Sequence, residues 1–209
     1  MALVKYNNNS ISAITAAASI PTGAMNLIKT QTASSSASIS FIHGTSDVVF
    51  DGTYDTYLFK FINMHPASDG IFLQFQGNTA GGSGFNETIT SSNFIAYHFE
   101  DGSAQALNYN AGGDLAQGTG FQRLSQNVGN DADQCVSGSL HLFKPSSTTF
   151  VKHFIATTNT IADDNGPANS FVSGYFNTTS AIDEIQFKMS SGNIDSGVIK
   201  MYGLSKSWA

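Results

Sequence analysis

Residues 184–189 read Glu-Ile-Gln-Phe-Lys-Met, and this short stretch decides the fold class. Its apolar side chains, Ile185, Phe187 and Met189, alternate with charged and amide side chains. Successive side chains of a β-strand point to opposite faces of a sheet, so strict alternation predicts a strand with one face in a core and the other in water. Half-buried strands of this kind are typical of antiparallel sheets.

The same period of two recurs along the chain from residue 25 onward. It predicts nine more strands, at residues 27–32, 38–43, 54–64, 71–76, 93–99, 137–143, 150–157, 170–176 and 197–204. Stretches rich in Gly, Pro, Asn, Asp and Ser lie between many of these segments, at residues 65–70, 144–147, 163–167 and 190–193, and they favour tight turns. We therefore expect an all-β fold, an antiparallel β-sandwich of the jelly-roll type.

Some segments depart from simple alternation. Residues 57–62 and 93–99 carry bulky apolar side chains at both parities, which predicts central strands covered on both sides or strands at a subunit contact. Residues 77–87 and 102–128 are expected to form long loops at one end of the sandwich, where recognition tends to occur. Within the second loop we expect a short helix at residues 115–124, although Gly118 and Gly120 interrupt it.

The closing strand also carries apolar side chains on both faces. Val198, Tyr202 and Leu204 share one parity, while Ile199 and Met201 share the other. We expect one of these faces to lie in the core and part of the other to contact a neighbouring subunit.

The length of 209 residues predicts one large domain, or one domain with an arm. Residues 1–24 contain no aromatic residue after Tyr6, are rich in small residues, and end near Pro21 and Gly23. Such a segment cannot build a core, so we expect either an extended N-terminal arm that orders against a partner or a floppy tail. Residues 25–209 are then the sandwich domain.

Composition excludes several classes of protein. Ser, Thr, Asn and Gly make up 82 of the 209 residues and charged residues 11%, a profile that excludes an all-helical fold. Nine Lys and Arg residues, of which only Arg123 is an arginine, and a net charge of −6 leave no basic surface for nucleic acid. No apolar run approaches the roughly 20 residues of a membrane helix, and no secretory signal is apparent, so we expect synthesis in a host cytoplasm without membrane insertion.

The residues that carry chemistry are scattered along the chain. His43, His65, His98, His141 and His153 show no metal-binding spacing. We expect structural histidines, although the last three lie in predicted strands and would have to converge from neighbouring strands to hold a metal. The single cysteine, at residue 135, cannot form an internal disulfide; we expect a buried small hydrophobe, with an intermolecular bridge as the alternative.

Two pairs of acidic residues lie in loops rich in Gly and Asn. Asp131 with Asp133, and Asp163 with Asp164, are expected to be solvated turn residues; oxygen-rich loops also bind calcium, but neither pair has EF-hand spacing. There is no phosphate-binding glycine loop and no Gly-x-Ser-x-Gly sequence. The paired carboxylates of a glycosidase can come from anywhere in a chain, and nothing in the sequence indicates them. We therefore predict no catalytic, cofactor-binding or metal-binding residues and no cofactor.

The last third of the chain carries a resemblance. Residues 171–183 and 185–189, followed by residues 192–204 with the sequence Ser-Gly-Val-Ile-Lys-Met-Tyr-Gly at 196–203, resemble the closing strands of small virion structural proteins of tailed bacteriophages, many from marine and cyanobacterial hosts. Residues 28–34 and 57–67 are similar to the same group, so the likeness extends over much of residues 25–204. The shared patterns mark strands and turns, and no catalytic or binding residue is carried over.

The resemblance implies a non-enzymatic virion protein, a head decoration (cement) or short head-fibre protein. It would be a homotrimer whose N-terminal arm contacts the major capsid protein or tail proteins. The alternative is a tail-associated protein that binds a receptor or a host-surface carbohydrate, with Tyr97, Tyr109 or Tyr175 as a stacking platform for sugar. A third class, an enzyme such as a polysaccharide depolymerase, has no motif in its favour.

Overall fold

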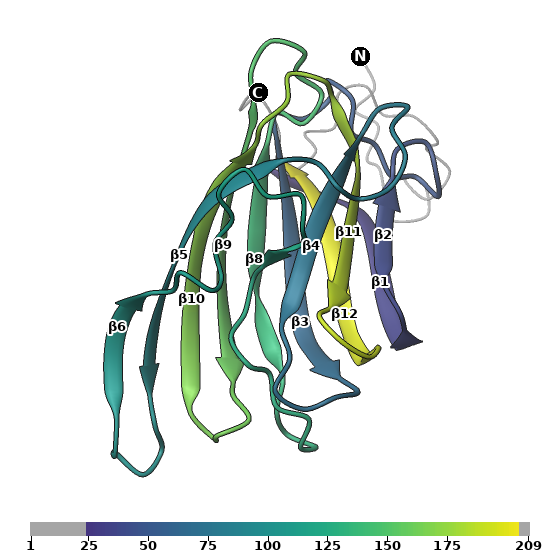
Figure 1. The fold of residues 1–209 in the computed structure, drawn as a ribbon. Coiled ribbons are helices and arrows are strands. Elements are labelled where there is room, and N and C mark those ends of the chain that lie inside the picture. The colour runs from purple at the N-terminus through teal and green to yellow at the C-terminus, as the bar shows by residue number, and fades with distance from the viewer. Residues whose placement is uncertain (1–23, 205–209) are drawn as a thin grey trace, which may run out of the picture.

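The computed structural model describes residues 24–204, which fold into two antiparallel sheets packed face to face (Figure 1). The larger sheet has eight strands in the order β1-β12-β3-β8-β9-β10-β5-β6, and the smaller has four in the order β2-β11-β4-β7. The strands are β1 (Met25–Ser36), β2 (Ile39–Ile42), β3 (Thr56–Pro66), β4 (Leu73–Thr79), β5 (Ile89–His98), β6 (Gln105–Tyr109), β7 (Gln122–Arg123), β8 (Val136–Phe143), β9 (Lys152–Ile161), β10 (Pro167–Phe176), β11 (Ile182–Met189) and β12 (Ile194–Leu204).

The antiparallel sandwich is therefore confirmed, while its jelly-roll type stays a prediction. All ten expected strands are present. The N-terminal arm falls almost wholly on residues 1–23, which lie outside the described residues. Two further strands, β6 and β7, were not predicted from the sequence. β7 has only two residues, and β6 has five that include Gln105 and Asn108, so neither shows a clear alternating pattern.

The helix expected at residues 115–124 is wrong. The backbone of this segment bonds to β5 instead of to itself: Gly118 and Ile89 exchange two hydrogen bonds of 2.8 and 3.0 Å, and Leu115 N donates to Ser91 Oγ at 2.9 Å. Leu124 N then donates to Leu73 O of β4 at 2.8 Å. The long connection from β6 to β8 thus bonds first to β5 of the larger sheet and then to β4 of the smaller one. It bridges the two sheets, rather than forming a loop at one end of the sandwich.

The core lies between the two sheets and is dominated by aromatic side chains. Phe187 of β11 is fully buried, and its ring centroid lies 5.2 Å from those of Phe59 and Phe61 on β3. The rings of Phe41 and Phe75, from the two strands that flank β11, both lie 6.2 Å from it. The alternation in residues 184–189 is confirmed, because the odd-numbered side chains are the buried ones.

The closing strand β12 lies in the interior of the larger sheet, between β1 and β3. Ile199 and Met201 are fully buried, whereas Val198, Tyr202 and Leu204 are only half-buried. The face with the odd-numbered residues is therefore the core face, and the other points away from the smaller sheet. Of the two strands with apolar residues at both parities, β3 is central, while β5 is next to the edge.

The smaller sheet does not reach the far end of the larger one. Figure 1 shows β6, β5 and the lower part of β10 extending beyond it. There the inner face is covered by the β6–β8 connection, and the contacts are polar: Gln122 Nε2 and Asn93 Nδ2 both donate to Gly113 O, at 2.7 and 3.3 Å. Because this half is closed by loops and polar bonds rather than by a sheet, it has room for a surface cleft.

Candidate functional site

The face of the larger sheet that points away from the smaller one carries a large set of apolar side chains. We call it the apolar outer face and define it by Leu27, Leu58, Ile62, Phe94, Leu107, Tyr109, Ile155, Phe171, Val198 and Tyr202. Strand register aligns many of them: Leu27 lies opposite Tyr202, Tyr202 opposite Leu58, Leu58 opposite His141, and His141 opposite Ile155. One row of largely apolar residues thus crosses five neighbouring strands.

A second row on this face is aromatic. Phe171 of β10 lies opposite Phe94 of β5, which lies opposite Tyr109 of β6. The rings of Phe94 and Phe171 are parallel within 10°, with centroids 4.9 Å apart, and the two residues are 42% and 37% exposed. In a stacked pair each ring covers one face of the other, so those two ring faces are not available to a sugar. The pair forms an apolar ridge on the outer face.

The apolar outer face has an unusual charge distribution. The eight strands of the larger sheet contain one acidic residue, Asp195 at the start of β12, although the chain has 15. Lys60 and Lys200 lie directly opposite each other on neighbouring strands of this face. Like charges in such a pair destabilise a sheet by roughly 0.2–1 kcal/mol. Burial, followed by the charge of Lys60, lowers the pKa of His141. This face is thus cationic on an acidic protein.

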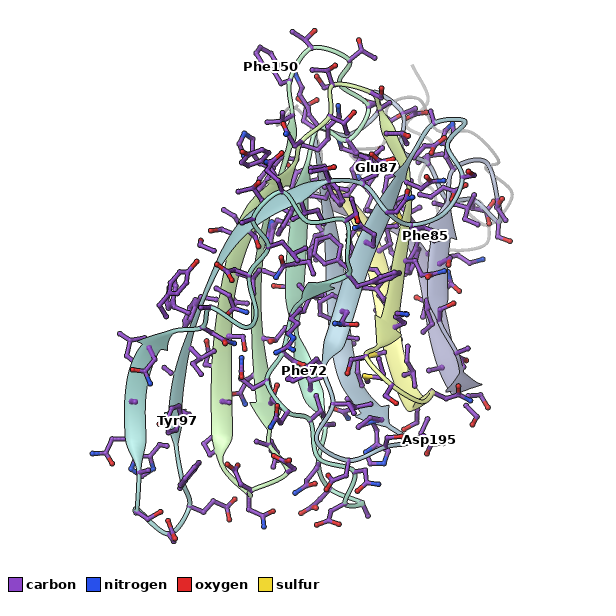
Figure 2. The ribbon with its side chains drawn as sticks, in the orientation of Figure 1. Phe72, Phe85, Glu87, Tyr97, Phe150 and Asp195 are labelled. Carbon is purple, nitrogen blue, oxygen red and sulfur yellow. The ribbon has the colours of Figure 1, made fainter. Side chains whose placement is uncertain are left out.

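A cleft of about 130 Å³ lies on the opposite, inner side of β5, near the turn between β9 and β10. We call it the Tyr97 cleft; Figure 2 shows Tyr97 at the lower end of β5. Its aromatic wall consists of Tyr97 and Phe99, whose ring centroids lie 5.6 Å apart at an angle of 34°. Its polar walls consist of Gln126, Asn127, Asp163 and Asp164.

The turn expected at residues 163–167 is present and positions the carboxylates of the cleft. Ala162 N donates to Gly166 O at 2.9 Å, and Gln134 Nε2 fixes the turn by donating to Asn165 Oδ1 at 2.9 Å. The ring of Phe99 packs against Gly166, where an added Cβ would lie 2.8 Å from Phe99 Cδ1. Only glycine therefore allows the aromatic wall to lie this close to the turn.

One buried polar group of the cleft has no partner in the described part of the chain. Gln126 Nε2 is buried and makes no hydrogen bond there. The side chains of Asp163 and Asp164 are exposed, as expected for solvated turn residues. An unpaired buried donor costs roughly 1–3 kcal/mol, so such groups are rare unless something else satisfies them. The cleft thus combines aromatic rings with exposed carboxylates and, in its wall, a buried donor that has no partner among the described residues.

The structure does not bring the three tyrosines together. Tyr97 lies in the cleft, whereas Tyr109 and Tyr175 lie on other parts of the larger sheet. The Tyr109 hydroxyl donates to the carboxylate of Asp114, which raises the pKa of Tyr109. The ring of Tyr175 has its centroid 5.9 Å from that of His153, its cross-strand neighbour.

The histidines are also dispersed. His43 Nδ1 accepts a hydrogen bond from Phe50 N at 3.0 Å, and His65 Nδ1 lies 2.7 Å from Gln134 O, so these two are structural. The other three lie on β5, β8 and β9. Within residues 24–204, no three His, Cys, Asp or Glu side chains gather as a metal site.

The remaining sequence predictions concern Cys135 and the membrane. Cys135 is half-buried rather than buried, because it lies just before β8, and burial raises the pKa of its thiol. Among residues 24–204 we find no helix long and apolar enough to cross a membrane.

No sequence pattern singled out Phe99, Gln126 and Asn127 as cleft residues, or Leu107 as a residue of the apolar outer face. The cleft residues lie in segments distant in sequence, and no local pattern relates them. For Leu107 the sequence did contain a signal. Leu107 and Tyr109 are two residues apart in a five-residue stretch, so in a strand their side chains point to the same face.

Comparison of the chain with models of protein families, with curated proteins and with solved structures found no match. The apolar outer face and the Tyr97 cleft are the two features of the described chain that bear on its function.

Proposed function

We propose that this chain is a non-enzymatic structural protein of a bacteriophage virion and that it acts as a homotrimer. The apolar outer face is the contact between copies. The observation that carries the proposal is the row from Leu27 to Ile155, in which four side chains with apolar surface and His141 lie in register across five strands. Leu27 and Ile155, at its two ends, are 55% and 51% exposed. Exposed apolar surfaces of this extent mark protein interfaces. The role in the particle, a head decoration (cement) or short head-fibre protein, follows from the resemblance of residues 171–204 to phage virion proteins.

The charges on this face favour a further copy of the chain as its partner. Lys60 and Lys200 need carboxylates opposite them, and the other 14 acidic residues lie outside the eight strands that form the face. A two-fold contact uses the same patch on both subunits, so the lysines would face strands that hold only one acidic residue, Asp195. A head-to-tail contact, in which the face of one copy meets acidic loops of the next, pairs opposite charges. Such contacts close into rings when the rotation permits, and a trimer is one such ring.

The oligomeric state tests the contact. We expect light scattering and native mass spectrometry of the full chain to give a trimer, and thermal melting to shift with protein concentration, because partner subunits stabilise the folded form. Ile155→Asp, which changes a residue that is 51% exposed on this face, should yield a folded monomer. Phe150→Asp is the matched control, since Phe150 is 71% exposed between β8 and β9 and lies outside the apolar outer face (Figure 2). A monomeric wild type with a melting temperature independent of concentration would contradict the proposal.

The place in the particle is tested by copy number. Quantitative mass spectrometry of purified virions should give copies comparable in number to the major capsid protein if the chain decorates the head. A few copies per virion would support the tail-associated alternative instead. Absence from purified virions would refute the virion role while leaving the contact between copies untouched.

A further inference from the structure

We propose that the Tyr97 cleft binds carbohydrate, taking one uncharged pyranose unit of a glycan. This goes beyond the assembly role, because the cleft lies on the inner side of β5 and the apolar outer face lies on the other. The two surfaces are separate, so the same chain can associate through one and recognise a ligand with the other.

The aromatic wall provides the apolar half of such a site. Tyr97 and Phe99 are tilted by 34°, so their rings do not cover each other as those of Phe94 and Phe171 do at 10°. Tyr97 is half-buried, and its hydroxyl has no hydrogen-bond partner among residues 24–204. An aromatic ring with an apolar body and a free polar tip suits a ligand that has both a C–H face and hydroxyl groups.

The polar walls provide the complementary half. The carboxylates of Asp163 and Asp164 accept hydrogen bonds from sugar hydroxyls, and hydrogen bonds to charged acceptors are the stronger kind. Gln126 Nε2 is a buried donor that no residue in the described chain satisfies, and it lies in the wall of the cleft. The Nε2 atom itself is closed off from solvent, so a sugar oxygen reaches it only when the Gln126 side chain turns toward the cleft. Ligand sites have this composition, with aromatic surface and a few polar groups that fix the orientation.

Other ligand classes fit less well. The cleft wall contains no Lys or Arg and has two carboxylates, which disfavours phosphates, uronic acids and acidic peptides. No third acidic or histidine ligand joins the two carboxylates within the described residues, so a metal ion lacks a ligand set. The volume of about 130 Å³ is small beside the roughly 300–1,000 Å³ of pockets for drug-sized ligands, which limits the bound part to one ring.

The test uses the full chain and saturation-transfer NMR with the methyl glycosides of glucose, galactose, mannose and N-acetylglucosamine. Methyl glucuronide serves as the acidic counterpart. We expect transfer to at least one neutral glycoside and none to the glucuronide at neutral pH. Titration should place the largest shifts at Tyr97, Phe99 and the turn at residues 163–166.

Variants connect the binding to the cleft. Asp164→Asn keeps the shape of the side chain but replaces a charged acceptor by a neutral one, and should weaken binding about fivefold. Tyr97→Ala should abolish binding. Tyr175→Ala, which removes an aromatic residue outside the cleft, should leave the affinity unchanged. Thermal melts confirm that each variant folds.

Three results would overturn the proposal: no transfer to any neutral glycoside, equal affinity for the glucuronide, or unchanged affinity in both cleft variants. The mass of the oligomer is measured in the same samples. A variant that loses sugar binding but keeps its oligomer tests the binding site alone. A variant that keeps sugar binding but loses its oligomer tests the assembly contact alone.

Discussion

Replacing Phe187 by alanine tests the central feature of the core, the aromatic contact between the two sheets. The ring is fully buried and lies within 6.2 Å, centroid to centroid, of four other rings, two of them on the opposite sheet. Removal of a buried Phe side chain costs about 3–5 kcal/mol, against a total stability of about 5–15 kcal/mol for a domain. For a chain of this size that corresponds to a fall in melting temperature of about 6–20 °C.

The measurement is urea unfolding and thermal melting of wild type and variants at one protein concentration, so that any association affects all samples alike. Phe187→Leu, which keeps most of the volume but loses the ring contacts, should fall between Phe187→Ala and wild type. Phe150→Ala is the control, because this residue is 71% exposed and its loss should change stability by no more than about 0.5 kcal/mol. A cost below about 1 kcal/mol for Phe187→Ala, with an unchanged urea slope, would refute our description of the core.

Three further predictions follow from individual positions. Met201→Ala should lower the unfolding free energy by about 2–5 kcal/mol at every protein concentration, because Met201 is fully buried. Leu204 is half-buried, so Leu204→Ala should cause a smaller loss, and this loss should depend on protein concentration. Equal losses that do not depend on concentration would contradict the assignment of the two faces of β12. Burial is the larger cause, and the charge of neighbouring Glu184 the second, that raises the pKa of Asp183. The folded state therefore binds the proton of this carboxyl more tightly than the unfolded state does. Stability is lost as the pH rises through the folded pKa and the carboxyl ionises. Asp183→Asn should therefore raise the melting temperature at pH 7, with a gain that shrinks as the pH is lowered through the folded pKa toward the ordinary value of 3.8; a gain that is the same across this range would be inconsistent with the mechanism. Gly138→Ala should destabilise by about 1–3 kcal/mol or more, because its Cβ would lie 2.3 Å from a backbone oxygen of β9, while Gly52→Ala, with open space around the added methyl group, should be close to neutral in a urea melt.

The contrast between β11 and β12 shows how far alternation can be used. In β11 the apolar residues occupy one parity only, so residues 184–189 predict both the strand and its buried face, and both are confirmed. In β12 apolar residues occupy both parities, so the sequence predicts a strand with two apolar faces but not which face is the core. That choice depends on the sheet that packs over the strand, which is not a local property.

Local patterns along the chain were enough to predict ten of the strands, many of the turns and the all-β class, because the period of a strand and the conformational preferences of Gly, Asn and Pro operate within a few residues. The order of strands, the row from Leu27 to Ile155 and the Tyr97 cleft were decided only by the tertiary structure. The row combines residues from opposite ends of the chain because β12 inserts between β1 and β3. The cleft combines three segments, residues 95–99, 126–127 and 162–168, that meet only when the β9–β10 turn and the β6–β8 connection close over β5. Contacts over such separations depend on which surfaces pack together in three dimensions, and no pattern within a single segment contains that information.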